Sequence, residues 1–502
     1  MLITDTQLLF YQRCHRRAFL NFYGDRHQKQ PPSDFLLKLT QDSLAHQKRW
    51  LATLGAQPVD YPKSDRRAGA TATLELMEQG VERICQGVLW WQPPHLQQED
   101  LTEALGEIDL VSYPDVLVKR PGVSKWGDWV YSPVDIKFGK RPKLDYQIIA
   151  AFHAYILGAI QETTPDHAGL ILREKGEYQV NLKQRLPQMQ ELLLNYVEMI
   201  ARREEPEVFI ARQKCSLCLW HDNCHAIAEA ENHLSLLPGI TPSRYARLST
   251  LNLTRVEAVA QLEPKQLESY PEFADSSAQQ VIIQAQVTWK NQPVLRSSQL
   301  DSIQSHGKVH STSILTQNPP VELYFDIEAQ PDLSLDYLHG VLVVDHRQQT
   351  ETFYPFLART PVEEEASWQQ FLELVWAYPI APIYHFCDYE AKTIQRLGKH
   401  YQTPTYLWKP LVKRCVDIHE HVVKTVILPV ESYALKSIAR WLGFQWRNPN
   451  ANGAQCVYWY EQWLTKGDRT ALDAIIQYNE DDCRATYHVK AWLSNFLRQS
   501  QA

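Results

Sequence analysis

A cysteine-rich segment constrains the fold of this chain more than any other feature of its sequence. Cys215, Cys218 and Cys224 fall within ten residues, a spacing that lets three thiolates converge on one metal centre. A fourth ligand is needed, and Cys14 is the candidate. Four thiolates suit either a 4Fe–4S cluster or a structural zinc ion.

Zinc stays open as an alternative because His221 and His225 lie beside the cysteines, although the five-residue gap before Cys224 is unusual for zinc. Either metal would join Cys14 to a segment some two hundred residues later. The first 230 residues are therefore expected to form a domain whose two ends meet. Loss of the metal is expected to unfold much of it.

The composition favours a multidomain globular protein. A length of 502 residues predicts roughly two to four domains, and 44% apolar residues suffice for their cores. A net charge of −7, from 51 Lys and Arg against 58 Asp and Glu, excludes a polycation but not a locally basic nucleic-acid site. Nine cysteines are too few for a disulfide scaffold. With no apolar run of membrane-spanning length and no basic–apolar leader, we expect a cytoplasmic protein without membrane contact.

The pattern along the chain predicts an α/β protein of several domains. Residues 1–230 mix helical stretches with short strands, and 231–295 are helical around a Leu-Pro-Gly-Ile turn. Residues 296–320 are rich in Ser, Gln and Pro and are expected to form a linker. From 321 to 502, strands at 321–328, 340–345 and 380–386 alternate with helices at 364–377, 388–399, 433–442 and 470–494.

Acidic residues in the N-terminal half form the first candidate catalytic site. Asp109 follows Gly106 on a predicted strand, and Asp135 and Lys137 lie two apart on another, so they point to the same face. Two carboxylates and a lysine can hold Mg²⁺ and steady a hydroxide that attacks a phosphodiester. His46, on a helical stretch, could complete the site.

The order of these residues resembles the RecB-like PD-(D/E)xK nucleases with an iron–sulfur clasp, a group that includes AddB-type and CRISPR-associated exonucleases. The resemblance covers about residues 1–230 and implies a restriction-endonuclease-like core. It implies Mg²⁺ or Mn²⁺ at Asp109 and Asp135, with Lys137 assisting the water and His46 near the metal. It also implies a 4Fe–4S cluster rather than zinc at Cys14, Cys215, Cys218 and Cys224.

One helix departs from the pattern of that family. The family usually carries Gln-x-x-x-Tyr on the helix after its lysine, whereas the register here places Ile149 and His153 at those positions. Gln147 could substitute from one turn away. The departure predicts weaker contacts to a DNA strand and motivates the hypothesis that this site has degenerated.

A second acidic set lies in the C-terminal region. Asp326 and Glu328 share one face of a predicted strand, and Tyr478 and Asp482, four residues apart, share one face of a helix. Glu390 lies between these pairs in the sequence, where a strand runs into a helix. Four acids and a tyrosine can bind two metal ions and position water for in-line attack on a phosphodiester.

This set resembles the ribonuclease H-like DEDD exonucleases of the DnaQ superfamily, in particular the YprB-like branch, over about residues 320–495. By position, Asp326 and Glu328 match the first motif, Glu390 the second, and Tyr478 and Asp482 the third. The resemblance implies a 3′-to-5′ exonuclease in which Tyr478 orients the attacking water.

The second motif of this region differs from the superfamily pattern. Glu390 stands where Asp is common, and His385 stands where Asn often does, so Asp388 and Asp417 are alternative ligands. In a later stretch that also resembles the YprB-like branch, Lys436 or Arg440 could meet phosphates, although a solvated helix face explains them equally well.

The whole arrangement, an iron–sulfur RecB-like module followed by an exonuclease-like module, is similar to a bacterial family of RecB-like nucleases. The turn at 237–240 is similar to a helix-hairpin-helix, a motif that grips the DNA backbone through amides. Basic residues such as Lys140, Arg141 and Lys143 group beside the proposed N-terminal site, as phosphate binding requires.

We therefore predict a metal-dependent nuclease with two sites, with DNA as the expected partner. The alternative is a DNA-end or branched-DNA binding protein in which one or both nuclease sites are degenerate. A third hypothesis is an iron–sulfur redox sensor or a zinc-stabilised scaffold.

Overall fold

The computed structural model describes residues 1–174, 176–274, 277–296, 315 and 317–501. The chain divides into two compact units, Met1–Ala226 and Ile227–Ala502. The predicted linker at 296–320 falls largely outside the described residues. Within the described part of the chain, no helix combines the length and the hydropathy that a membrane-spanning segment needs.

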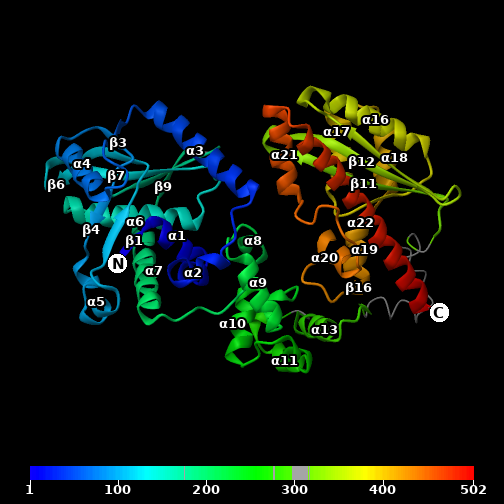
Figure 1. The fold of residues 1–502 in the computed structure, drawn as a ribbon, viewed down its shortest axis with the longest axis horizontal. Coiled ribbons are helices and arrows are strands. Elements are labelled where there is room, and N and C mark those ends of the chain that lie inside the picture. The colour runs from blue at the N-terminus through cyan, green and yellow to red at the C-terminus, as the bar shows by residue number, and fades with distance from the viewer. Residues whose placement is uncertain (175, 275–276, 297–314, 316, 502) are drawn as a thin grey trace. The chain divides into compact units, whose positions relative to one another are not determined.

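The first unit is built on a six-stranded mixed sheet with the strand order β2-β3-β6-β7-β8-β9 (Figure 1). Its central hairpin joins β6 (Val116–Ser124) to β7 (Gly127–Lys137), and β7 pairs in parallel with β8 (Ala168–Leu172). The remaining strands are β2 (Gln57–Pro58), β3 (Arg83–Cys85) and β9 (Gly176–Val180). Because β7 lies between two other strands, it is held firmly in place and its inward-facing side chains are buried.

A buried helix organises the core of this unit. α6 (Leu144–Gln161) is buried almost continuously from Gln147 to Leu157, and a helix that is apolar on most sides must be covered on most sides. It packs on β7, β8 and α7 (Leu182–Arg202), and on a small sheet of β1 (Leu2–Thr4), β5 (Asp109–Ser112) and β4 (Leu89–Trp91). The other helices are α1 (Asp5–Arg13), α2 (His15–Tyr23), α3 (Asp34–Leu54), α4 (Arg66–Glu78), α5 (Glu99–Leu105), α8 (Arg212–Cys215) and α9 (His221–Ala230).

The second unit contains a five-stranded sheet with the order β13-β12-β11-β14-β15. β11 (Val321–Gln330), β12 (Leu335–Asp345) and β13 (Thr350–Leu357) are antiparallel, whereas β14 (Ile383–His385) and β15 (Cys415–Asp417) run parallel to β11. β13 was not predicted from the sequence. Its residues alternate poorly, because this edge strand is exposed along much of its length.

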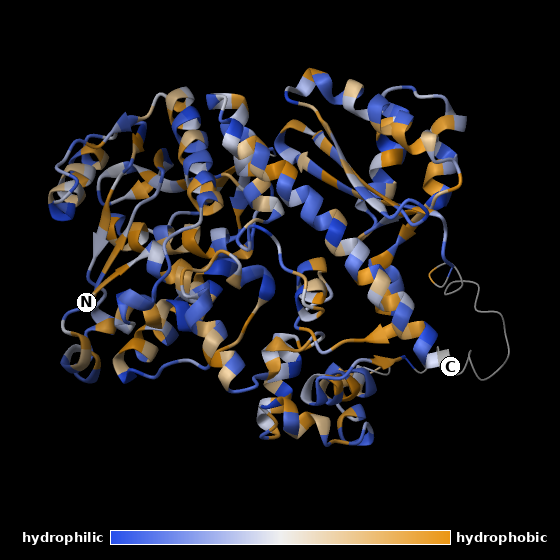
Figure 2. Ribbon diagram, turned by 45° about the vertical axis from the view of Figure 1, so that its right-hand side comes forward, coloured by the Kyte–Doolittle hydropathy of each residue, from blue (hydrophilic) through white to orange (hydrophobic). Residues whose placement is uncertain are grey.

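Helices cover both faces of this sheet (Figure 1). Successive β11 residues alternate between two cores, so that Leu323, Phe325 and Ile327 lie in one and Tyr324 in the other. Figure 2 shows hydrophobic stretches on the strands next to hydrophilic ones, and the helices likewise mix hydrophilic and hydrophobic residues. The helices are α16 (Glu364–Ala377), α17 (Tyr389–His400), α18 (Thr405–Arg414), α19 (Ile418–Thr425), α20 (Leu435–Trp441), α21 (Gly453–Lys466) and α22 (Arg469–Gln501).

Residues 242–290 are largely helical and pack against the C-terminal sheet domain. This segment contains α10 (Pro242–Thr250), α11 (Val256–Ala260), α12 (Lys265–Glu268) and α13 (Ser277–Lys290). On α13, the Gln284 amide donates to the Leu428 carbonyl at 2.8 Å, and β10 (Val294–Leu295) pairs with β16 (Val426–Ile427). The predicted Pro-Gly turn is formed, with Gly239 at φ 86°, a conformation that favours glycine.

Candidate active sites and cysteine cluster

Three acids of the second unit converge on one point. Asp326 and Glu328 come from β11 and Asp482 from α22, and their carboxylate oxygens lie within 4.8 Å of one another. The period of two along β11 brings the first two acids to the same face, while Ile327 packs in the opposite core. Closely spaced carboxylate oxygens of this kind suit Mg²⁺ or Mn²⁺.

Neutral hydrogen-bond donors orient these acids. The Asn479 side-chain amide donates to Asp326 Oδ2 at 2.7 Å, and the Trp446 indole donates to Asp482 Oδ1 at 2.6 Å. Tyr478 also hydrogen-bonds to Asp482. Because none of these donors carries a charge, they fix the carboxylates without neutralising them.

The negative charge of this cluster is poorly compensated by the protein itself. Burial, followed by repulsion from Asp482, raises the pKa values of Asp326 and Glu328 well above their usual range. Burial also raises the pKa of Asp482 to about 6. The Lys436 ammonium attracts Glu328 and Asp482 but donates a hydrogen bond to the Ala451 carbonyl. A divalent cation fits this donor set because it would relieve the repulsion.

Glu390 is the fourth acid near this cluster. It lies buried at the start of α17, and its repulsion contributes to the raised pKa of Asp326. His385 Nδ1 lies 3.5 Å from Glu390 Oε2 and holds this side chain. The alternative ligands have other partners: Asp388 forms an ion pair with Lys392 on an exposed face, and Asp417 caps α19.

The two basic residues predicted to meet phosphates are engaged with the backbone. Lys436 donates to the Ala451 carbonyl, and Arg440 donates to the Pro449 carbonyl at 3.0 Å. Both carbonyls belong to the loop that follows Trp446, the residue that holds Asp482. Lys436 and Arg440 therefore help to hold the loop next to Trp446, which donates to Asp482.

A family model described as the RNase_H superfamily matches residues 323–494. The second unit therefore contains an RNase H-like domain. The match runs from β11 to α22 and includes all four acids and Tyr478. Domains of this superfamily indicate metal-dependent nuclease activity on nucleic acid, typically with Mg²⁺ or Mn²⁺. No curated protein matches the chain.

A second acidic site lies on the central hairpin of the first unit. Lys137 Nζ lies 3.0 Å from Asp135 Oδ2, and His153 Nε2, on α6, lies 3.3 Å from the same oxygen. Asp115, just before β6, accepts a hydrogen bond from the Ile136 amide at 2.6 Å. The Asp115 amide in turn lies 3.4 Å from Asp135 Oδ1.

The structure pairs Asp135 with Asp115 and not with the predicted Asp109. Asp109 begins β5, at the end of that strand remote from Asp115, and its carboxylate lies 3.8 Å from the Arg67 guanidinium. The register of the hairpin, Val116 opposite Val134, brings Asp115 beside Asp135. The sequence signal that could have identified it is the Pro-Asp pair that ends at Asp115, because the motif PD-(D/E)xK begins with those two residues.

Of the other predicted members of this site, His153 alone contacts an acid directly among the interactions of the described residues. His46 is buried on α3, with its ring centroid 5.7 Å from that of Phe138, and its neighbour Gln47 donates to Asp115. Gln147 donates to the Pro142 carbonyl at 2.7 Å and accepts from Arg185, so it is engaged away from the acids. Ile149 lies in the apolar core, whereas His153 contacts Asp135 directly.

The charge balance of this site differs from that of the RNase H-like domain. Burial opposes ionisation of Asp135, but Lys137 and His153 hold its pKa well below the usual range. Burial and then repulsion from Asp135 raise the pKa of Asp115 to about 6. In the RNase H-like domain neutral groups hold Asp326 and Asp482, whereas here two cationic groups contact Asp135.

The four predicted cysteine ligands lie together in the first unit. Burial raises the pKa of the Cys215 thiol, and repulsion from Cys14, Cys218 and Cys224 raises this pKa further, as expected for thiols grouped in one region. Cys14 joins α1 to α2, and its sulfur lies 3.4 Å from the Arg17 amide. Trp220, between Cys218 and Cys224, packs on Phe19 and Leu20 of α2.

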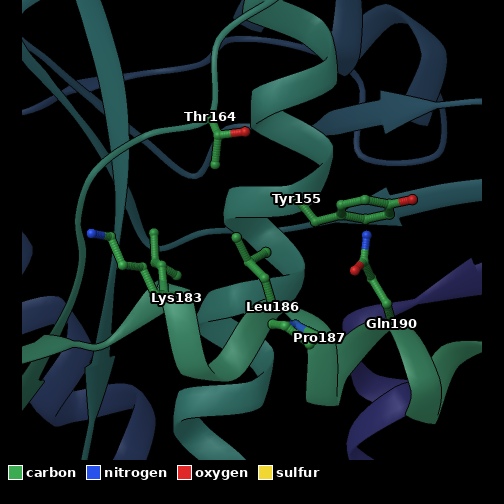
Figure 3. Close-up of a pocket in the computed structure, with 7 residues that line it drawn as sticks. Tyr155, Thr164, Lys183, Leu186, Pro187 and Gln190 are labelled. Carbon is green, nitrogen blue, oxygen red and sulfur yellow. The ribbon is translucent and has the colours of Figure 1, made fainter.

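A hollow of about 320 Å³ lies between α6 and α7 of the first unit (Figure 3). Figure 3 shows the Tyr155 and Gln190 side chains facing each other along one side of it. Its lining consists of Tyr155, Thr164, Leu182, Lys183, Leu186, Pro187 and Gln190. None of the acids or cysteines described above lines this hollow.

Proposed function

We propose that the RNase H-like domain is a metal-dependent exonuclease that removes nucleotides from the 3′ end of DNA. The observation that carries this proposal is the convergence of Asp326, Glu328 and Asp482, whose carboxylate oxygens lie within 4.8 Å of one another and repel one another. Together with Glu390, these acids would hold one or two divalent ions. A bound ion would polarise the scissile phosphate and lower the pKa of the attacking water.

Tyr478 has the properties needed to orient that water. Burial and the surrounding acids raise the pKa of its phenol far above the usual range, so the phenol stays protonated at neutral pH. Its hydrogen bond to Asp482 ties it to the acidic cluster. A protonated phenol next to metal-binding acids can fix the position of a water by hydrogen bonding without competing for the metal.

The polarity and the substrate are tested with end-labelled strands. Single-stranded DNA, double-stranded DNA and RNA are each incubated with the full-length chain and Mg²⁺ or Mn²⁺. The proposal expects mononucleotides released from the 3′ end of DNA, in a reaction that chelation stops. Cleavage confined to RNA, or internal cuts that ignore the 3′ end, would contradict it.

We further propose that the first unit is a RecB-like PD-(D/E)xK nuclease module with Asp115 and Asp135 as its metal ligands and Lys137 assisting the water. The supporting observation is the contact between Asp115 and Asp135 at the end of the central hairpin. A 4Fe–4S cluster is proposed at Cys14, Cys215, Cys218 and Cys224. The observation that supports a metal centre there is the grouping of the four thiols, of which Cys14 comes from the start of the unit and the other three from its end.

The choice of acid in the first unit can be tested by comparing Asp115→Ala with Asp109→Ala. The Asp326→Asn background removes the activity of the RNase H-like domain. In this background, we expect Asp115→Ala to lower the remaining Mg²⁺-dependent cleavage at least about tenfold, since a second carboxylate beside Asp135 is needed to hold the ion. Asp109→Ala should retain it, because the Asp109 carboxylate is paired loosely with exposed Arg67. The measurement is product formed from labelled DNA. If only Asp109→Ala lost cleavage, Asp109 would be the metal ligand, as the sequence predicted.

One observation favours a second candidate function for the first unit, a DNA-end or branched-DNA binding module. Lys137 and His153 already neutralise Asp135, which reduces the attraction of that carboxylate for a metal ion. In this case Asp326→Asn would abolish all cleavage but leave DNA binding that weakens with salt. If the Asp326→Asn variant forms more metal-dependent product than the variant that also carries Asp115→Ala, the binding-module function is excluded.

A further inference from the structure

We propose that Asn479 positions Asp326 for metal binding, and that glycine at position 340 is required because only glycine leaves room for the Asn479 side chain. The inference deepens the proposed function of the RNase H-like domain and rests on it. Asn479 would act through Asp326, as a positioning residue without contact to the substrate.

The geometry around Asn479 is unusually restrictive. The residue is fully buried on α22, directly after Tyr478, and its amide donates to Asp326 Oδ2 at 2.7 Å. Across the sheet, Asp326 on β11 is paired in register with Gly340 on β12. An added Cβ at Gly340 would lie 1.6 Å from Asn479 Oδ1 and 2.8 Å from Asn479 Cγ.

Space, and not backbone conformation, is therefore the reason for glycine at this position. Gly340 lies in a regular strand and is absent from the glycines with positive φ. A side chain there would have to push Asn479 off Asp326 or push α22 off the sheet, since a Cβ approach under 3 Å requires one of the two groups to move and Asn479 is fully buried. Either movement would disturb Asp326, the acid that faces Gly340.

The chemistry of an amide suits this task better than that of a cation. A neutral donor fixes one carboxylate oxygen and leaves the full negative charge available to a metal ion. In the first unit, by contrast, Lys137 and His153 form ion pairs with Asp135, which offset the negative charge of this carboxylate. Groups that orient metal ligands typically change metal affinity or activity by about 10- to 100-fold when removed.

The test compares Asn479→Ala, Gly340→Ala and the double variant in the full chain. Mn²⁺ binding is measured by titration, and the part lost in Asp326→Asn is assigned to this site. We expect each single variant to weaken that binding by about 10- to 100-fold. The double variant should bind no more weakly than either single variant, because both changes remove the same interaction.

Folding stability separates positioning from packing. Gly340→Ala should lower the melting temperature, because the added Cβ clashes with Asn479. Adding Asn479→Ala removes the clashing atoms and should restore part of the lost melting temperature. Mn²⁺ binding should stay weak in this double variant. Gly453→Ala is the matched control, because its added Cβ meets no atom within 4 Å beyond its chain neighbours and its own helix backbone, and this variant should bind Mn²⁺ like the unchanged chain.

The outcomes distinguish this inference from the proposed function. A folded Asn479→Ala variant with unchanged, Asp326-dependent Mn²⁺ binding would overturn the positioning role alone. Additive losses in the double variant would show that Gly340 acts independently of Asn479 and would overturn the pairing. If Asp326→Asn itself leaves Mn²⁺ binding unchanged, the metal site of the proposed function fails, and the inference fails with it.

Discussion

Asp326→Asn should lower metal-dependent cleavage by the RNase H-like domain by roughly 1,000-fold. The change keeps the shape of the side chain but removes one charge from three acids whose oxygens lie within 4.8 Å of one another. Metal ions contribute several kcal/mol of transition-state stabilisation, and each 1.36 kcal/mol corresponds to a factor of ten. The measurement is the rate of release of labelled 3′ nucleotides under single-turnover conditions.

The same substitution should stabilise the metal-free protein at neutral pH. The pKa of Asp326 is raised in the folded state, so folding favours its protonated form and loses stability as the pH rises above the pKa of the unfolded chain, about 4. Asp326→Asn removes that loss. Its melting temperature should therefore exceed that of the unchanged chain at pH 7.5 without metal, and the difference should shrink towards pH 4.

A matched control uses an acid of the same region that lies outside the cluster. Asp388→Asn changes an exposed residue paired with Lys392, and cleavage should stay within about twofold of the unchanged chain. Full activity in Asp326→Asn, or equal losses in both variants, would remove the basis for the metal site.

The acids of the RNase H-like domain could be predicted because local periodicity determines their geometry. Asp326 and Glu328 share a face of one strand, and Tyr478 and Asp482 share a face of one helix, so sequence spacing alone brings each pair together. The groups that orient them could not be predicted in this way. Trp446 reaches Asp482 from a loop far away in sequence, and no periodic pattern reports such a contact.

The acids of the first unit show what sequence reasoning could not supply. Asp109 and Asp115 both flank short strands, and the sequence alone does not show which strand pairs with β7. The hairpin register decides the matter, because it places Asp115 opposite the end of β7 while β5 joins another sheet. His153 was expected only as a departure from a family pattern, yet the path of α6 across the sheet brings it to Asp135.

Cys218→Ala should abolish binding of the proposed iron–sulfur cluster and release residues 203–226 from the rest of the first unit. Besides the cysteines, several contacts hold this segment: Trp220 packs on α2 and donates to Asn21 at 3.0 Å, Arg16 donates to the Pro206 carbonyl at 2.6 Å and pairs with Glu205, and the Gln30 backbone amide donates to the Leu219 carbonyl at 2.8 Å. Structural metal centres can contribute about 10–16 kcal/mol, as zinc-finger peptides show, which exceeds the contribution of any one of these contacts.

The sheet and α6 should survive this loss, since their apolar core draws its buried residues from positions up to Ile200. We therefore expect loss of the metal to unfold only the cysteine-bearing end of the domain, and not most of it as the sequence suggested.

Limited proteolysis of anaerobically purified protein should show new cleavage near Arg203 and Arg212 in Cys218→Ala. The iron content and the visible charge-transfer absorbance should disappear in the same variant. Cys85→Ala, a buried cysteine of β3 outside the cluster, should retain both. A colourless chain that holds zinc alone would exclude the iron–sulfur assignment, and an unchanged digestion pattern would show that the protein contacts suffice.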